Sequence, residues 1–355
     1  MLKSRPRLTQ GDGPRSSEVA MTLTQLRAFV AVARLGSVKA AALSLGVSDP
    51  AVSGAVAVLR RELGDRLFVR SAGGIALTPG GRRLAAGAAE IVGLAEETRR
   101  QVRQAGAEGS SLRVAATEAT AEQIVPPLLE AFVRRHPDVE TTTLAVPSTA
   151  LGELLLDRRA DVAISPVTAE PGTVAAPPGP DALEHIPFLR IQLVVVAAPR
   201  RVGARPDHAG GGRPHLPIGR LSREHWLLGP GGLDPATPGG AFLTRHGVGD
   251  ADASIFPSAS AALGAAVAGD GLSLAVLHLV RDELRHGALT VVAVPGTPVN
   301  GVLEAVALRG DRRSPAAFAL CRFVTTPAAV RSLLARSTGV PVDHYRPTVR
   351  VSLWS

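Results

Sequence analysis

The sequence predicts an N-terminal all-α winged helix-turn-helix with a long linker helix behind it, followed by an α/β domain. Three observations predict this fold class. Short helical patterns separated by glycines occupy residues 22–64, and one uninterrupted helical pattern covers residues 79–104. From residue 112 onward, strand and helix patterns alternate, as they do in α/β domains. The chain has 355 residues, which is long enough for two or three domains.

The first helix begins after Thr22 and ends at Gly36, because apolar residues recur there at the spacing of one helix face. These residues are Leu26, Phe29, Val30 and Ala33. Ser37 then caps a second helix, Val38–Leu45, whose alanines allow a neighbouring backbone to approach closely. Gly46 ends this helix in a left-handed turn.

The third helix runs from its N-cap at Ser48 to Gly64. Asp49 complements the positive end of the helix, and Pro50 is tolerated in the first turn, where no partner is needed for its missing N–H. Its buried stripe consists of Val52, Val56, Leu59 and Leu63. With the helices in front of it, this segment predicts a helix-turn-helix.

The outward face of the third helix carries small side chains where a surface helix ordinarily carries charge. These residues are Pro50, Ser53, Gly54 and Ala57. Small side chains let a helix backbone approach base edges in the major groove, so this face predicts a DNA contact. The competing interpretation is an alanine-rich helix that is packed on both faces.

A short hairpin and a long helix follow. Arg66–Arg70 and Ile75–Leu77 alternate as strands around a turn, which predicts a wing whose arginines, with the flanking Thr78, reach phosphates. The long helix begins at Pro79 and ends near Gln104. Its seam residues alternate by four and three: Leu84, Ala88, Ile91, Ala95, Thr98 and Val102. Because an exposed seam of this kind needs a partner helix, we expect a homodimer that presents two recognition helices to two half-sites.

The positive charge of the chain is concentrated in its front part. Residues 21–110 hold 12 Arg and Lys against 7 Asp and Glu, a net charge of +5, whereas residues 111–338 hold 21 against 21. A local basic excess is typical of a nucleic-acid partner, although a solvated basic face has the same composition.

Composition and motifs exclude other classes of protein. Cys321 is the single cysteine, so a disulfide framework or a multi-cysteine metal site is excluded, and its apolar neighbours place it in a core. The sequence has neither a spanning apolar run nor a secretory signal, which predicts a cytoplasmic protein without a membrane partner. No catalytic or phosphate-binding fingerprint is present, so neither an enzyme nor a cofactor is expected. His208 and His215 lie in a Gly/Pro-rich loop, and solvent exposure explains them better than a metal does.

The α/β part begins after a linker at Gly106–Ser111. Expected strands are Leu112–Ala116, Thr141–Val146, Asp161–Ser165, Ile191–Ala197, Trp226–Leu228, Leu272–Val276, Leu289–Val294 and Leu303–Leu308. Expected helices are Ala121–Arg135, Ser148–Arg159, Gly239–His246, Ser260–Ala268, Val276–Arg285 and Ser314–Leu334. This alternation predicts mostly parallel strands. Residues 1–20, 199–220 and 337–355 are expected to lack regular structure.

The order of these signals resembles the LysR-type transcriptional regulators. The front part carries the resemblance in TLTQLRAFVAVARLGSVKAAALSLGVSDPAVSGAV and LRRELGDRLFVRSAGGIALTPGGRRL, and the rear part in LVVVAAP and VPGTPV. It extends from about Met21 to Leu334. The resemblance implies a dimerising linker helix and a regulatory domain like a type 2 periplasmic-binding protein, with a ligand between two lobes. It also implies tetramers, an interrupted inverted repeat in promoter DNA, a small-molecule effector and possible contact with RNA polymerase.

The implied domains follow the composition of the chain. They are an N-terminal extension at 1–20, a winged helix-turn-helix at 21–79, a linker helix at 80–105, an effector-binding domain at 111–336 and a C-terminal tail at 337–355. Within the effector-binding domain, lobe I is expected at 111–166 and 292–336, and lobe II at 167–291.

The resemblance assigns DNA contacts to particular residues. Ser48, Asp49, Pro50 and Ser53 match the groove-entering positions of the family. The family often has a polar or basic residue where this chain has Gly54, so we expect specificity to depend on the serines, the wing and DNA shape. Candidates for phosphate contact are Thr24, Gln25, Arg27, Ser37, Lys39, Arg66, Arg70 and Thr78.

Hydroxyl groups at strand-helix junctions predict the effector site. They belong to Thr117, Thr120, Ser148, Thr149, Ser165, Ser258 and Ser260. Helix N-termini offer free N–H groups and positive dipole ends, which favours an anionic metabolite. The alternative is that each hydroxyl only caps its own helix. Many members have a Thr-Arg-containing turn after the strand that matches Trp226–Leu228, but this chain reads GPGGLDPATPGG there, so no effector chemistry is inferred from the turn.

Two other functions remain at this stage. An exported solute-binding protein shares the rear domain but needs a signal sequence and has no helix-turn-helix. A nucleoid-type protein uses basic charge alone and binds DNA without sequence preference. Steep salt dependence without preference for its own upstream region distinguishes the nucleoid-type protein from a specific regulator.

Overall fold

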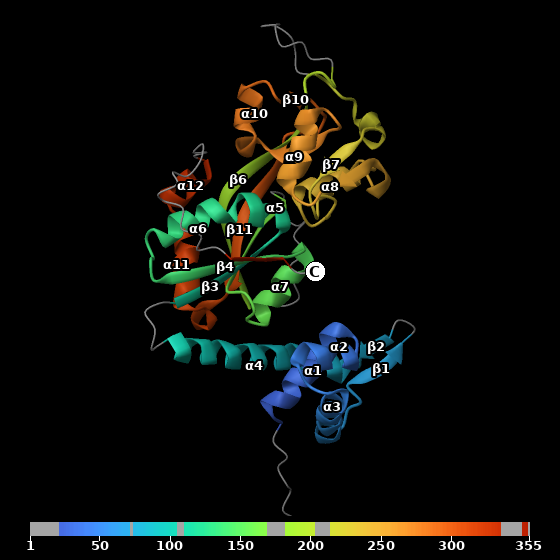
Figure 1. The fold of residues 1–355 in the computed structure, drawn as a ribbon, viewed down its shortest axis with the longest axis vertical. Coiled ribbons are helices and arrows are strands. Elements are labelled where there is room, and N and C mark those ends of the chain that lie inside the picture. Colours follow the sequence, from blue (N-terminus) through green and yellow to red (C-terminus); the bar gives the residue numbers. More distant parts are fainter. Residues whose placement is uncertain are drawn as a thin grey trace, which may run out of the picture. The chain divides into compact units, whose positions relative to one another are not determined.

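The computed structural model describes residues 21–71, 74–104, 110–168, 182–202, 214–334 and 350–353. The chain divides into two compact units, Met1–Ala95 and Glu96–Ser355, and each is described by itself (Figure 1). The predictions for residues 1–20, for His208 with most of its loop, for most of the 106–111 linker and for most of the tail lie outside the described residues.

The helices of the first unit are confirmed. They are α1 (Leu23–Leu35), α2 (Val38–Leu45) and α3 (Asp49–Leu63). The angle between α2 and α3 is 110°, and this interhelical angle lies within the range found in helix-turn-helix proteins. The predicted recognition helix therefore stands in the expected geometry to the helix before it.

Local capping explains where these helices begin and end. Thr22 and Ser37 accept hydrogen bonds from backbone N–H groups in the first turns of α1 and α2. Gly36, Gly46 and Gly64 follow the three helices with φ of 61°, 66° and 64°. Glycine adopts this left-handed conformation without the strain that a side chain introduces, so it ends each helix at a defined residue.

The core of the first unit surrounds Phe29, which is fully buried. Its other buried members are Leu26, Ala28, Val30, Val32, Ala41, Ala42, Val52, Val56, Leu59, Leu67, Phe68 and Ala88. Phe29 lies 5.0 Å from Phe68, measured between ring centroids, and this contact attaches the wing to the helices. Leu63 does not complete the predicted stripe, because it is 44% exposed at the last turn of α3.

The wing is an antiparallel hairpin of β1 (Phe68–Ser71) and β2 (Gly74–Leu77). The first strand begins two residues later than predicted. The reason is Leu67, whose φ of 60° interrupts extended structure while its side chain is 1% exposed in the core.

Helix α4 (Pro79–Gln104) is a single long helix, as predicted. Its predicted seam has two environments. Leu84 and Ala88 pack against the helix-turn-helix core, whereas Ile91 is 47% exposed and Val102 is 69% exposed. The front of the seam therefore belongs to the fold of this unit, and apolar surface remains further along the helix.

The second unit contains two lobes around a mixed sheet. Lobe I has the parallel strands β3 (Ser110–Ala116), β4 (Val139–Ala145) and β5 (Val162–Thr168). Its helices are α5 (Glu118–Gln123), α6 (Val125–Val133), α7 (Ser148–Leu156), α11 (Pro315–Val324) and α12 (Pro327–Leu334). Helices α6, α11 and α12 pack on one face of the sheet and α7 on the other, which buries both faces (Figure 1).

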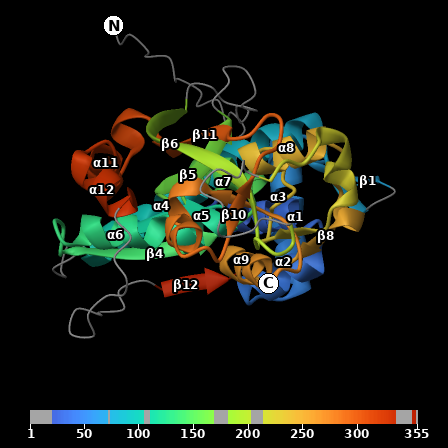
Figure 2. The same cartoon turned by 90° about the horizontal axis from the view of Figure 1, so that it is seen from above.

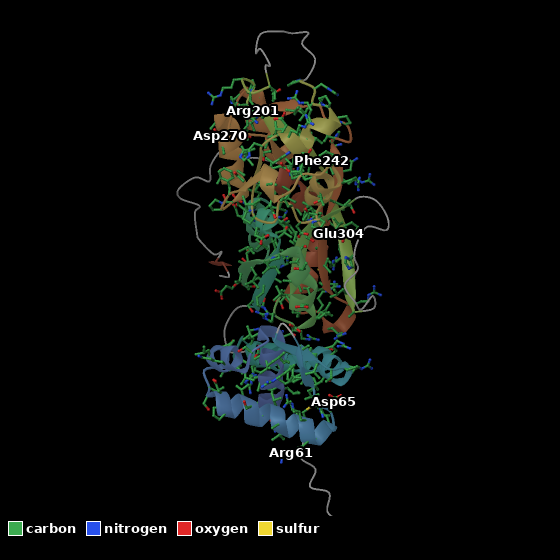
Figure 3. The ribbon with its side chains drawn as sticks, turned by 90° about the vertical axis from the view of Figure 1, so that its right-hand side faces the viewer. Arg61, Asp65, Arg201, Phe242, Asp270 and Glu304 are labelled. Atoms are coloured by element: carbon green, nitrogen blue, oxygen red, sulfur yellow. The ribbon has the colours of Figure 1, made fainter. Side chains whose placement is uncertain are left out.

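Lobe II contains β7 (Trp226–Leu228), β8 (Ala253–Ile255), β9 (Ser273–Val276) and β10 (Thr290–Val292), with α8 (Pro238–Arg245), α9 (Ala259–Ala268) and α10 (Arg281–Arg285). One of its cores holds Trp226, which is fully buried, and Phe242, which is 5% exposed and is labelled in Figure 3. A second core lies under α9. Strand β8 was not predicted, and it pairs in parallel with β7.

Two long strands run through both lobes. These strands, β6 (Leu183–Ala197) and β11 (Val299–Leu308), are longer than predicted and pair antiparallel. Strands β9 and β10 also pair antiparallel with β6, so the prediction of mostly parallel strands is wrong for this part of the sheet. Strand-helix alternation does not reveal such direct neighbours, because long-range pairing leaves no mark in local sequence. The proposed lobe boundaries stay a prediction.

Prolines divide several predicted helices. The helix predicted at Ala121–Arg135 begins earlier and is split at Ile124 into α5 and α6, with Pro126 and Pro127 in the first turn of α6. The helix predicted at Ser314–Leu334 is likewise interrupted before Pro327. The missing proline N–H and the ring clash with the preceding turn explain both breaks. The helix that begins at Ser148 ends at Leu156, three residues before its predicted end at Arg159.

The tail contains regular structure that the sequence did not predict. Strand β12 (Arg350–Leu353) pairs in parallel with β4 at the edge of the sheet, as Figure 2 shows. Within the described residues, no helix is both long and apolar enough to cross a membrane on its own. The same residues hold no cluster of side chains suited to bind a metal ion.

Candidate nucleic-acid interface and ligand cavity

The first half of α3 presents an open surface. Ser48, Asp49, Pro50, Ser53 and Gly54 are all exposed. Ser48 stands at the N-cap, but its hydroxyl makes no capping hydrogen bond. A Cβ added to Gly54 would meet nothing within 4 Å. The alternative of an alanine-rich helix packed on both faces is therefore wrong, and among the described residues no neighbour within 4 Å explains why position 54 is a glycine.

Some predicted phosphate contacts have a role within the fold. Ser37 accepts the N–H of Ala40 as the cap of α2, at 3.3 Å. Gln25 accepts the N–H of Thr22 at 2.8 Å in a capping box. Lys39, Arg66 and Arg70 are exposed. Thr24 is exposed and Arg27 is half-buried.

A hydrogen-bond network supports the base of the wing. Thr78 donates its hydroxyl to Asp65 Oδ1 at 2.7 Å and accepts the N–H of Gly81 at 2.8 Å. The N–H of Leu67 also donates to Asp65 Oδ1, at 2.6 Å. These two bonds, that of Leu67 first, lower the pKa of Asp65, which is labelled in Figure 3. The Thr78 hydroxyl thus joins the wing to the start of α4.

Cation-π packing adds to the attachment of the wing. The guanidinium carbon of Arg60 lies 5.9 Å from the centroid of the Phe68 ring. Arg60 and Arg61 are exposed in the last turns of α3, and Arg61 is labelled in Figure 3. Their positive charges stand at the C-terminal end of the helix, where they also complement its dipole.

The second unit contains a cavity of about 160 Å³. Its lining comes from four segments, within residues 117–124, 228–240, 259–263 and 273–280, with further contacts from β5, β6 and β11. The lining therefore combines the helix starts and turns of several elements that are far apart in the chain. Apolar side chains such as Ile191 and Leu274 form much of the wall.

The cavity brings together only part of the predicted effector site. Thr117 and Thr120 line it, are 6% and 4% exposed, and share a hydrogen bond of 2.9 Å between their hydroxyls. The other predicted residues lie outside the lining, namely Ser148, Thr149, Ser165, Ser258 and Ser260. Of these, Ser258 accepts the N–H of Ala261 as the cap of α9, which is the alternative role considered above.

The cavity wall includes residues that sequence reasoning missed. The turn GPGGLDPATPGG supplies Gly229–Gly232, Asp234 and Thr237–Gly240. Thr237 caps α8 and Pro238 follows in its first turn, a signature that sequence reasoning can find. Glu118 and the β9 segment carry no such signal, because only the fold brings them to the cavity.

Two polar contacts join the lobes beside the cavity. Ser148 Oγ donates to Asp234 Oδ2 at 2.5 Å. Glu122 of α5 accepts the N–H groups of Ala259 and Ser260 at 2.8 Å and 3.1 Å, at the start of α9. Both contacts place a carboxylate of this chain at the junction between the lobes.

Cys321 behaves as a core residue. It is 3% exposed among the apolar side chains of lobe I, and burial raises the pKa of its thiol to about 11. The thiol is therefore protonated at neutral pH, where a nucleophile requires the thiolate.

These features define a class: a DNA-binding protein with a winged helix-turn-helix and a second unit built around a ligand cavity. Models of known families match both parts. The bacterial regulatory helix-turn-helix protein model of the LysR family matches residues 23–82, and the LysR substrate binding domain model matches residues 105–328. The chain belongs to the LysR family of transcriptional regulators.

Similar proteins agree with this assignment. An uncharacterised HTH-type transcriptional regulator of Mycobacterium tuberculosis is 38% identical over 336 residues, which cover 94% of this chain and 100% of that protein. The HTH-type transcriptional regulator CfxR of Cupriavidus necator is 32% identical over 301 residues, 84% of this chain and 89% of that protein. Full-length OxyR from Pseudomonas aeruginosa shares the fold, with a TM-score of 0.56 at 19% identity over 91% of this chain and 99% of that chain.

Proposed function

We propose that this LysR-type regulator binds an interrupted inverted repeat in promoter DNA as a homodimer or tetramer, and that a small effector bound in the cavity modulates this binding. It acts in the cytoplasm, on DNA, as a regulator without catalytic activity of its own. RNA polymerase is a further partner at the promoter. The DNA contacts we assign are Ser48, Asp49, Pro50, Ser53 and Gly54 on α3.

The observation that supports sequence-specific binding is the open first half of α3. The five assigned residues there are all exposed, and Gly54 has free space where a Cβ would stand. Glycine inside a helix is destabilising by roughly 0.5–1 kcal/mol relative to alanine, so a glycine without a packing reason points to selection for another property. Close approach of the backbone to base edges is such a property.

Apolar surface on α4 supports self-association. Ile91, Leu94 and Val102 are 47%, 47% and 69% exposed, although other apolar residues of the same helix, such as Leu84 and Ala88, pack against the core. An exposed apolar seam on a long helix is covered when two such helices pair. A dimer formed in this way supplies two recognition helices for two half-sites.

The test is footprinting on the intergenic region beside the gene of this protein, with candidate metabolites added. We expect protection of two half-sites one or more helical turns apart, with the pattern or affinity changed by a metabolite. Protection without sequence preference that vanishes steeply with salt contradicts a specific regulator and supports nucleoid-type binding. Protection that no metabolite changes contradicts the effector part of the proposal.

A further inference from the structure

The ionisable side chains in the cavity wall are all acidic. Glu118 and Asp234 line the cavity, and no Arg, Lys or His lies in its lining among the described residues. In the same part of the chain, no basic side chain pairs with either carboxylate. The sequence predicts an anionic effector from helix N-termini, whereas the described lining carries two carboxylates and no basic side chain.

The N–H groups at the starts of α8 and α9 already have partners in this chain. At the start of α9, Glu122 accepts the N–H groups of Ala259 and Ser260. The next N–H, that of Ala261, donates to Ser258 at 3.1 Å. At the start of α8, the N–H of Gly240 donates to Thr237 at 3.1 Å. A carboxylate of the protein thus occupies the position where the sequence predicts a carboxylate of the ligand.

Of the two carboxylates in the wall, that of Asp234 is held by hydrogen bonds and that of Glu118 lies beside a glycine. Asp234 accepts Ser148 Oγ through Oδ2 and the N–H of Ala236 through Oδ1, at 2.5 Å and 2.9 Å. Glu118 lies against the glycine turn, because its Oε2 is 3.3 Å from the place where a Cβ on Gly231 would stand. The glycine at this position leaves room for the Glu118 carboxylate beside the cavity.

Electrostatic interactions determine which sign of charge the ligand carries. An anionic ligand near two carboxylates in a partly apolar cavity is repelled. A cationic ligand is attracted to the carboxylates, and this attraction replaces the interactions with water that it loses on entering the cavity. The apolar wall formed by Ile191, Leu193, Leu274 and Leu279 suits a hydrocarbon body. A cavity of about 160 Å³ limits that body to a small ring or short chain.

We propose that the effector is a small organic cation, an amine or amidine with a compact apolar body, whose charged group lies between Glu118 and Asp234. This inference rests on the proposed function of the cavity as the effector site and assigns its ligand class. Glu118 is the main partner of the cation, since Asp234 already accepts hydrogen bonds from within the chain.

The test compares probes of matched shape and opposite charge on the full chain. Thermal unfolding and calorimetric titration are measured with benzylamine against benzoate, and with cyclohexylamine against cyclohexanecarboxylate. We expect the amines to raise the unfolding temperature with increasing concentration and the carboxylates to leave it unchanged, since only a ligand of the folded state stabilises it. Stabilisation by the carboxylates, or by none of the amines at millimolar concentration, overturns the proposal.

Variants then locate the cation. Glu118→Gln keeps the shape of the side chain and is expected to weaken amine binding by about tenfold or more. Glu118→Ala is the second variant if Gln alters folding, and the unfolding temperature without ligand reports this. The matched control is Glu153→Gln, which removes the same charge from an exposed position of α7 outside the cavity and should bind amines like the parent. Equal amine affinity in parent and Glu118 variants overturns the assignment.

Promoter binding separates this inference from the proposed function. The control variant Glu153→Gln, without ligand, is expected to protect the footprinted half-sites as the parent does. Failure of the parent to protect any promoter site argues against the regulator function, whereas intact protection with carboxylate-responsive binding argues only against a cationic effector.

Discussion

The two functional surfaces of this protein differ in how they relate to the core. The proposed DNA-binding surface consists of neighbouring residues on one exposed side of α3, and the core lies on the other side of that helix. The cavity is enclosed by four segments from two lobes, and several lining residues, such as Leu228 and Leu303, are also core residues. Substitutions on this side of α3 should therefore change binding without lowering stability, whereas most substitutions in the cavity wall should change binding and lower stability.

The largest expected effect is on DNA binding. Ser53→Glu places a negative charge against the groove, and we expect it to weaken specific binding by about a hundredfold or more. Because Ser53 is exposed, the unfolding temperature should stay unchanged. A gel shift with the footprinted site and a thermal melt measure the two properties. Undiminished affinity argues against the groove assignment, and a lowered melting temperature argues against the proposed separation.

A substitution in the cavity wall, in contrast, should lower the stability of the protein. Gly240→Ala introduces a Cβ 2.0 Å from the carbonyl oxygen of Asp234, so backbone atoms must move. Overpacking of this kind is expected to lower the free energy of unfolding by about 1–3 kcal/mol. The matched control is Gly264→Ala in α9, where a Cβ would meet nothing within 4 Å. Urea denaturation of both variants checks this, and equal stability of the two contradicts the expected clash.

Removal of the Thr117 hydroxyl should affect both stability and the effector response, with a smaller loss of unfolding free energy than Gly240→Ala. Thr117→Val keeps the shape of the side chain but removes the hydrogen bond to Thr120, both residues being buried. We expect a loss of about 1 kcal/mol in unfolding free energy, together with loss of the effector response and retention of DNA binding. Unfolding curves and footprints with effector measure these properties. A fully retained response counts against a role of Thr117 in the effector site.

Acid pH should act on the wing through Asp65. Its pKa is lowered from 3.8 by the Leu67 N–H and the Thr78 hydroxyl, so the ionised form stabilises the folded state. This contribution is present above pH 3.8 and is lost as the pH falls through the lower folded value. We expect Asp65→Asn to unfold with a weaker pH dependence in that acid range. Acid titrations followed by circular dichroism that superimpose for both proteins would exclude this role.

The contrast between a surface on one helix and a cavity assembled from distant segments also explains which features the sequence could predict. The helices of the first unit are bounded by local signals, such as the cap at Ser37 and the glycine at Gly46, and these need no tertiary information. The antiparallel neighbours of β6 and the wall around Glu118 depend on residues far apart in the chain. Of the hydroxyls at helix starts that predict the effector site, those of Thr117 and Thr120 line the cavity, whereas that of Ser258 caps its own helix.

A small gain in stability is expected at Gly54, and this variant tests most directly whether DNA binding and stability are separable on α3. Gly54→Ala fills open space on a helix, so it should raise the free energy of unfolding by roughly 0.5–1 kcal/mol. Gly264→Ala occupies equally open space on α9 and should stabilise the chain by a similar amount. Only Gly54→Ala should also weaken promoter binding, because its methyl group stands where the backbone approaches the bases. If both variants bind the promoter like the parent, Gly54 is not needed for groove approach, and the small outward face of α3 requires another cause.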